Sequence, residues 1–173
     1  MSAEPEAATE AANPKDPIEW AAHYWKLHGI AGDSRRFLVL SSLLRYHRLV
    51  TESVEKVLRD QGLNLTDYLM LMTLELSDKG TRLISGLARS LLVHPTTATL
   101  ATDRLEARGL LSRSPHPTDR RATLVTISDE GRELVRSATV ALDGMGFGLS
   151  SGEGEEFEEF GGLLDTLRGR AER

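Results

Sequence analysis

The stretch DRRATLVTISDEG, residues 119–131, decides the fold. Its basic start leads into the segment 122–127, where β-branched side chains recur as they do in a half-buried strand. Ser128 then precedes two acidic residues, Asp129 and Glu130. This combination is typical of the first turn of a helix, because the free N–H groups there donate to side-chain oxygens and favour negative charge. The stretch therefore predicts a basic loop, a strand and a helix in succession.

A helix end and a second strand lie just upstream of this stretch. Residues 105–113, LEARGLLSR, end a helix at Gly109 and open a strand at about 111–115. The connection SPHPTD, residues 114–119, contains two prolines, which stiffen a hairpin and are excluded from the interior of a sheet. The whole region therefore predicts a helix, a strand, a basic hairpin, a strand and a helix.

Two more helix signals precede the hairpin. Ser85 begins a helix, and after a turn at Val93-His94-Pro95 a second helix spans Thr96–Arg108. Small and apolar side chains share the face that we expect to pack on the first helix: Ala98, Ala101, Thr102 and Leu105. The opposite face carries Thr96, Leu100, Asp103 and Ala107, flanked by Thr97 and Arg104. A helix-turn-helix followed by a basic hairpin predicts a mostly α fold, a winged helix-turn-helix head with a small β-hairpin wing.

Helices are also predicted on both sides of this head. Asp16 and Pro17 begin a short helix to about residue 28 that contains Trp20. Ser34 begins a helix over residues 35–61, which at 1.5 Å per residue is roughly 40 Å long, so it needs a partner outside its own domain. The other predicted helices are 68–76, which is capped by Thr66-Asp67 and buried on all sides, 129–143 and about 152–168.

These elements divide the chain into four predicted regions. They are a disordered tail at 1–15, N-terminal helices for dimerisation and a ligand pocket at 16–62, a winged helix-turn-helix DNA-binding domain at 63–131, and C-terminal dimerisation helices at 132–173.

Charge is distributed unevenly among these regions. The net charge of the chain is −5, but the segment 79–121 contains eight basic residues against three acidic ones, which leaves +5 there and −10 elsewhere. The local field decides which partner a surface attracts. A basic segment on an acidic chain therefore favours double-stranded DNA as the partner of that segment.

The composition argues against several other classes of protein. No apolar run approaches the roughly 18 residues of a membrane span and no secretion leader is visible, so we expect a cytoplasmic protein without a membrane partner. The chain has no cysteine and no pair of histidines at a spacing of four residues, so neither a metal nor a cofactor is expected. The sequence also lacks the alternation of strands and helices that would favour an enzyme.

The helix and the hairpin indicate how DNA would be bound. Threonine, leucine and arginine on the reading helix suit base edges and phosphates, and arginines at the hairpin legs suit the minor groove or flanking phosphates. The predicted DNA-binding residues are Ser85, Thr96, Thr97, Leu100, Arg104, Arg113, Arg120 and Arg121. We expect Asp119 to stabilise the wing by pairing with Arg121, and Asp103 to orient a neighbouring arginine.

Two segments carry a resemblance to a known family. They are the wing, at Asp119, Arg121, Ala122, Val125, Ile127, Ser128 and Gly131, and the end of the reading helix, at Asp103, Arg104, Leu105, Glu106, Gly109 and Leu110. In these segments the chain resembles the MarR family of transcriptional regulators, and the resemblance extends over about residues 35–168. It implies a homodimer with interlocked first and last helices that reads a pseudo-palindromic operator, and a repressor that a small ligand releases from DNA.

The resemblance also bears on the ligand. The helix of Trp20 is similar to an added helix of urate-responsive members, but the acidic residue expected in their second helix corresponds to Leu69 here, so urate is not predicted. Aromatic and cationic side chains suit a small anionic or phenolic molecule, and the predicted ligand-binding residues are Trp20, His28, Arg45, His47, Tyr68 and His94. Two alternatives stay open: a winged helix that binds a protein, and a DNA-binding protein without ligand control.

Overall fold

The computed structural model describes residues 15–119, 121–149 and 154–171, so the predicted tail lies outside the described residues except for Lys15. Among the helices of this described part, none has both the length and the hydropathy needed to cross a membrane. The chain forms two compact units, called here the N-terminal unit, up to Leu49, and the C-terminal unit, from Val50 onward. The boundary between the two units lies inside a helix.

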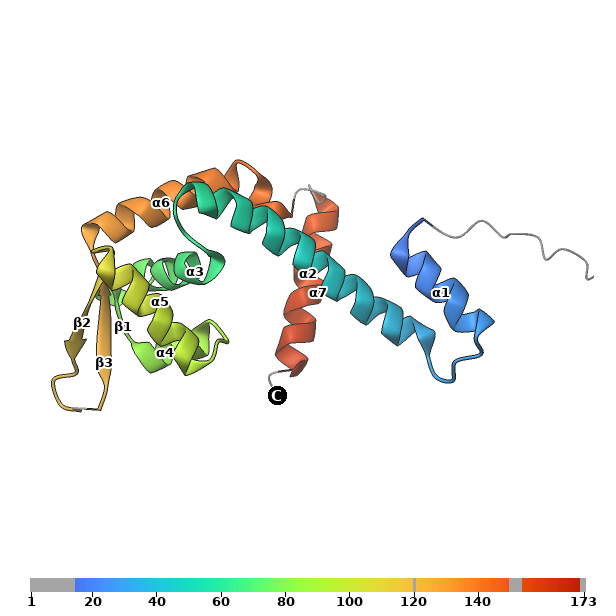
Figure 1. The fold of residues 1–173 in the computed structure, drawn as a ribbon, viewed down its shortest axis with the longest axis horizontal. Coiled ribbons are helices and arrows are strands. Elements are labelled where there is room, and N and C mark those ends of the chain that lie inside the picture. The colour runs from blue at the N-terminus through green and yellow to red at the C-terminus, as the bar shows by residue number, and fades with distance from the viewer. Residues whose placement is uncertain (1–14, 120, 150–153, 172–173) are drawn as a thin grey trace, which may run out of the picture. The chain divides into compact units, whose positions relative to one another are not determined.

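The N-terminal unit consists of helix α1 (Pro17–Leu27), a short loop and the first part of helix α2 (Ser34–Asp60) (Figure 1). The rings of Trp25 in α1 and Phe37 in α2 lie 5.2 Å apart between centroids, so an aromatic contact joins the two helices. None of the described side chains of this unit is buried. The unit therefore has no core of its own within the described chain.

The C-terminal unit follows the predicted order of helices and strands. After the end of α2 its elements are α3 (Leu65–Glu75), the short helix η1 (Asp78–Gly80), β1 (Thr81–Leu83), α4 (Ile84–Ser90), α5 (Pro95–Ala107), β2 (Leu111–Pro115), β3 (Thr123–Ile127), α6 (Asp129–Asp143), the short helix η2 (Gly146–Gly148) and α7 (Glu155–Ala171). The three strands form an antiparallel sheet in the order β1-β3-β2. Figure 1 shows β2 and β3 as a hairpin that projects beside α4 and α5.

The core of this unit lies between the sheet and helices α3, α4, α5 and α6. Its largest fully buried apolar side chains are Leu58, Met70, Leu71, Leu74, Leu87, Leu105, Val125, Val135 and Leu142. Val54 and Leu58 come from the last third of α2, which explains why the unit begins inside that helix. Burial of this apolar area is the main driving force for folding of the unit.

Two of the predicted helix caps are confirmed. The carboxylate of Asp16 accepts the N–H groups of Ile18 and Glu19 at 2.8 and 3.0 Å at the start of α1. The hydroxyl of Ser128 accepts the N–H of Gly131 at 3.0 Å at the start of α6. Each cap satisfies N–H groups that have no partner within the helix.

Three other predicted caps are wrong by one or two positions. Helix α3 is capped by Asn64 and not by Thr66-Asp67. Ser34 is the first residue of α2, and the carboxylate of Asp33 accepts a backbone N–H there instead. Ser85 lies inside α4, because β1 runs directly into that helix and leaves no loop for a capping residue.

Helix α3 is also less buried than its apolar sequence predicts. Tyr68, Met70, Leu71 and Leu74 are buried, whereas Leu69 is exposed, as is Leu76 directly after the helix. Helices α4, α5 and α6 and strand β3 contact α3 from within the unit, and Leu69 remains exposed. An apolar stretch predicts burial only where a neighbour reaches each side of the helix.

Candidate nucleic-acid interface

Helix α5 is positioned by its inner face, as the sequence predicts. Ala98, Ala101, Thr102 and Leu105 are all buried. The Thr102 hydroxyl donates to the Ala98 carbonyl at 2.7 Å and lies 3.5 Å from the sulfur of Met70 in α3. Apolar packing and a satisfied hydroxyl therefore fix the rotation of α5 about its own axis.

The outer face of α5 presents polar and apolar side chains to solvent. The His94 ring accepts the N–H of Thr96 at the start of the helix and lies 3.1 Å from its hydroxyl, so both residues take part in the N-cap. The Thr97 hydroxyl makes no hydrogen bond to a described residue, and Leu100 is 54% exposed. Thr97 and Leu100 are therefore the residues of this helix that are most available to a groove.

Arg104 is held by a buried carboxylate. Its Nη2 atom donates to Oδ1 of Asp67 at 2.7 Å. The side chain of Asp67 is 6% exposed, whereas that of Arg104 is 49% exposed. Asp67 is thus a buried acidic residue of α3, whereas Leu69, which corresponds to the acidic position of urate-responsive members, is an exposed apolar side chain. The pair of Arg104 and Asp67 joins α3 to α5 and leaves part of the guanidinium in solvent.

Arg113 lies at the base of the wing and contacts two carboxylates of α5. Its Nε and Nη2 atoms donate to Oε2 of Glu106 at 2.8 and 2.5 Å, and Nη1 donates to Oδ1 of Asp103 at 2.6 Å. The hydrogen bonds from Arg113 lower the pKa of the Glu106 carboxyl below its ordinary value. The same bonds, to Glu106 first and then to Asp103, raise the pKa of the guanidinium. The arginine that Asp103 orients is therefore Arg113.

The tip of the wing is shaped by backbone contacts. The Asp119 carboxylate accepts the backbone N–H of Arg121 at 3.0 Å, and no ion pair between these two side chains occurs. The His116 ring accepts the N–H groups of Thr118 and Asp119 at 3.4 and 3.3 Å. Arg121 is exposed and forms no ion pair with any described side chain, and Arg120 lies outside the described residues.

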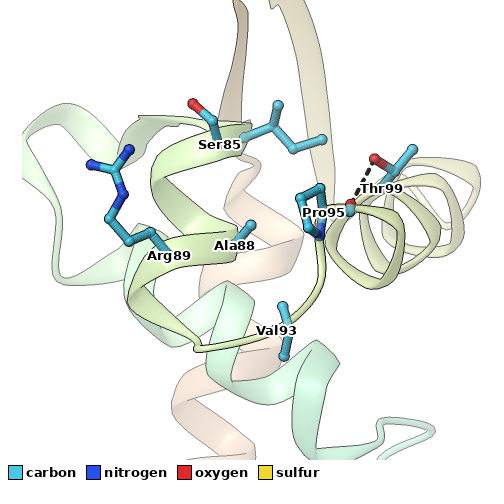
Figure 2. Close-up of a pocket in the computed structure, with 7 residues that line it drawn as sticks. Ser85, Ala88, Arg89, Val93, Pro95 and Thr99 are labelled. Carbon is cyan, nitrogen blue, oxygen red and sulfur yellow. Dashed lines mark hydrogen bonds between the residues drawn. The ribbon is translucent and has the colours of Figure 1, made fainter.

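Two exposed arginines near the start of the helix-turn-helix are absent from the predicted site. Arg82 in β1 and Arg89 in α4 form no ion pair within the described part of the chain. Arg89 and Ser85 border a groove of about 410 Å³ that is also lined by Ile84, Ala88, Val93, Pro95 and Thr99. Figure 2 shows the Arg89 side chain extending away from Pro95 and Thr99. A helix as short as α4 has too few residues for periodicity to reveal which side faces solvent. The sequence therefore shows that Arg89 is charged but not that it is exposed.

The predicted ligand-binding residues divide between two places. Trp20 and His28 line one pocket of about 610 Å³ in the N-terminal unit, together with Ala21, Tyr24, Trp25, Ile30 and Phe37. Arg45 and His47 are exposed on α2 and do not line that pocket. In the C-terminal unit, the Tyr68 hydroxyl lies 3.1 Å from that of Thr139 and His94 caps α5, so both take part in intramolecular contacts.

The helix-turn-helix of α4 and α5 with the β2–β3 wing defines a winged-helix protein. Residues 63–123 match the MarR family. The HTH-type transcriptional regulator YhbI of Bacillus subtilis is 31% identical over 117 residues, which cover 66% of this chain and 76% of YhbI. The crystal structure of Sco5413, a MarR family transcriptional regulator from Streptomyces coelicolor, is 35% identical with a TM-score of 0.74 and covers 79% of this chain and 95% of that one.

A ligand-bound structure is also similar. CouR from Rhodococcus jostii, crystallised with p-coumaroyl-CoA, is 28% identical with a TM-score of 0.64 and covers 78% of this chain and 90% of CouR. The chain belongs to the MarR family of transcriptional regulators. The relatives are regulators and not enzymes, as the sequence predicts for this chain.

Proposed function

We propose that the chain is a homodimeric repressor that binds a pseudo-palindromic DNA operator and is released by a small phenolic ligand. The observation that carries the DNA-binding role is the set of exposed cations and groove-sized side chains around α5. Arg82, Arg89 and Arg121 have no carboxylate partner among the described residues and are available to phosphates. Thr97 and Leu100 are available to base edges, where a hydroxyl bonds and a leucine contacts a thymine methyl.

Uncovered apolar surface supports the homodimer. On α2 the exposed apolar side chains include Phe37, Val39, Leu40, Leu43 and Leu44, and on α7 they are Phe157, Leu163, Leu164 and Leu167. Surfaces of this kind mark contacts with other molecules. A two-fold dimer would cover them and place two α5 helices in successive major grooves, about 34–36 Å apart. A dimer bound over a promoter would exclude RNA polymerase, which is why we propose repression.

The DNA-binding role can be tested on duplexes of random sequence. The full chain is used to select duplexes from a randomised library, and the affinity for the selected duplex is measured against salt concentration. Arg121→Gln should weaken binding and reduce the slope of log affinity against log salt by about 0.9 for each lost phosphate contact. Arg35→Gln, which removes an exposed charge in the N-terminal unit, is the matched control and should leave the slope unchanged.

Selection of no duplex would overturn the DNA-binding role and favour the alternative in which the wing binds a protein. An unchanged slope for Arg121→Gln, with selection intact, would remove Arg121 from the interface and leave the role itself standing. Failure of the DNA-binding role and failure of the assignment of Arg121 to the interface therefore give different results.

The pocket of the N-terminal unit supports a phenolic ligand over an anionic one. Its lining is aromatic and apolar and contains neither lysine nor arginine. Trp20 and Tyr24 lie 4.9 Å apart between ring centroids, and Tyr24 stacks on His28 at 5.8 Å. Such rings suit a planar aromatic molecule, with ring nitrogens and a hydroxyl to orient a phenol. CouR was crystallised with p-coumaroyl-CoA, whose acyl group carries a phenol, and this supports a phenolic group in the ligand.

Tryptophan fluorescence tests this pocket directly, because both tryptophans of the chain line it. p-Coumarate, phenol and benzoate are titrated into the protein and into the complex with the selected duplex. We expect p-coumarate or phenol to quench the fluorescence and weaken DNA binding, with benzoate less effective. Release of DNA without quenching would place the ligand elsewhere, and absence of both effects would favour a regulator without phenolic control.

A further inference from the structure

Arg113 has a different environment from the wing arginine at the other leg of the hairpin. In β2 it is paired in register with Val125 of β3, which is fully buried. Side chains of directly opposed residues point to the same face of a sheet, so Arg113 extends over the face that packs on the helices. On that face the guanidinium meets two carboxylates of α5.

The two carboxylates are placed by helical spacing. Asp103 and Glu106 are three residues apart on α5 and therefore lie on one face of the helix. Oε2 of Glu106 accepts Nε and Nη2 of Arg113, and its other oxygen, Oε1, accepts the backbone N–H of Arg113 at 3.0 Å. The side chains of Arg113 and Glu106 are 31% and 35% exposed, so the pair is shielded on one side. Both the side chain and the main chain of the strand are thus tied to the helix.

We propose that Arg113 is a positioning residue that latches the wing strand β2 to helix α5, and that it does not hold a DNA phosphate. This inference rests on the proposed DNA-binding function. With its guanidinium donating to two carboxylates, a phosphate would have to displace Asp103 or Glu106 to bind Arg113. This contact of Arg113 with Asp103 and Glu106, called the latch here, instead fixes the distance between the helix that contacts base edges and the wing that contacts phosphates.

The proposal and simple electrostatics predict opposite effects of Glu106→Gln on the affinity for DNA. Glu106 is a negative charge close to the expected DNA surface, so Glu106→Gln would strengthen binding if only the local field mattered. If the latch positions α5, Glu106→Gln weakens binding to the selected duplex by roughly threefold to thirtyfold, which lies within the range of couplings between contacting residues. Arg113→Gln should weaken it by a similar factor with an unchanged salt slope, in contrast to Arg121→Gln.

The experiment compares Arg113→Gln, Glu106→Gln and the double variant in the full chain, on the selected duplex and on a random duplex. The double variant should lose no more affinity than either single variant, and binding to the random duplex should change little. Tighter binding by Glu106→Gln, or a salt slope reduced by about 0.9 in Arg113→Gln, would overturn the latch and make Arg113 a phosphate contact.

Thermal unfolding of the same variants separates this inference from the proposed function. Glu106→Gln keeps the size of the side chain and an acceptor for the Arg113 N–H, so it is the variant that best preserves the fold. Melting temperatures that fall less in the double variant than the sum of the single changes would support the latch even if no DNA were selected. If the fall in melting temperature of the double variant equals the sum of the falls in the two single variants, the latch is overturned, whether or not DNA binds.

Discussion

Helix α2 has the same apolar spacing in both of its parts, yet only one part is buried. In the C-terminal unit, Val54 and Leu58 are 7% and 0% exposed. In the N-terminal unit, Phe37, Leu40 and Leu44 are 42%, 53% and 60% exposed. Apolar residues at three- and four-residue spacing show that a helix has a face to be covered. They do not show whether the cover comes from the same chain or from another one.

The two parts of α2 therefore contribute to different equilibria. The last third belongs to a core that one chain completes, so its side chains stabilise the folded unit itself. The first part has no buried side chain within the described chain, so its apolar residues would gain stability only through a further contact. A pair of matched substitutions, one in each part, can separate these contributions.

The largest effect is expected from Leu58→Ala. Leu58 is fully buried in the core of the C-terminal unit, and its truncation leaves a cavity in a packed interior. We expect the free energy of unfolding to fall by about 2–5 kcal/mol. Urea unfolding followed by far-ultraviolet circular dichroism, at several protein concentrations, measures the change. An unchanged midpoint would show that this part of α2 is not part of the core.

Leu40→Ala is the matched control in the first part of the same helix. Measured at a dilution where the chain is monomeric, it should leave the unfolding midpoint of the C-terminal unit unchanged. In the proposed dimer each lost contact is worth about 1 kcal/mol and occurs twice, so the dimer dissociation constant should rise roughly thirtyfold. Sedimentation equilibrium measures this constant. Unaltered self-association would place the dimer contact elsewhere.

The fold could be predicted from the sequence because its signals are local. Gly109 marks the end of α5, and the Ser128 cap marks the start of α6. The alternation in 122–127 predicts a strand, and the structure has β3 at Thr123–Ile127. Helix starts without a strong cap were less predictable. For α4 the preceding residue, Leu83, is paired with Leu124 in the sheet, and that long-range pairing, not a nearby serine, sets where the helix begins.

The candidate site was less predictable, because the sequence shows which residues are charged but not which charges are paired. Asp67 is 37 residues from Arg104, so no local pattern joins them. Arg113 and Arg121 have the same side chain at the two legs of one hairpin, and only the fold reveals that the first contacts Asp103 and Glu106. Pairing of this kind depends on tertiary contacts, which no periodicity encodes.

A second cluster ties the C-terminal unit together and yields the smallest expected effect. Glu75 in α3 accepts hydrogen bonds from two arginines of α6: Arg132, and Arg136 through Nε at 2.7 Å. The hydrogen bonds, that of Arg136 first, outweigh the partial burial of the carboxyl and lower the pKa of Glu75 below its ordinary value of 4.5. This lowered pKa makes the stability of the unit dependent on pH.

The sign of that dependence follows from the direction of the shift. A lowered pKa in the folded chain adds stability that is complete above about pH 4.5 and is lost as the pH falls through the folded-state pKa. Glu75→Gln should therefore reduce the free energy of unfolding by about 1 kcal/mol at pH 7, with the difference from the wild type shrinking below pH 4.5. Glu133→Gln, at an exposed position of α6, is the control and should show no such narrowing. Urea unfolding at pH 7, 5 and 3.5 measures both variants, and a difference that stays constant with pH would mean that the ionised carboxylate of Glu75 is not what joins α3 to α6.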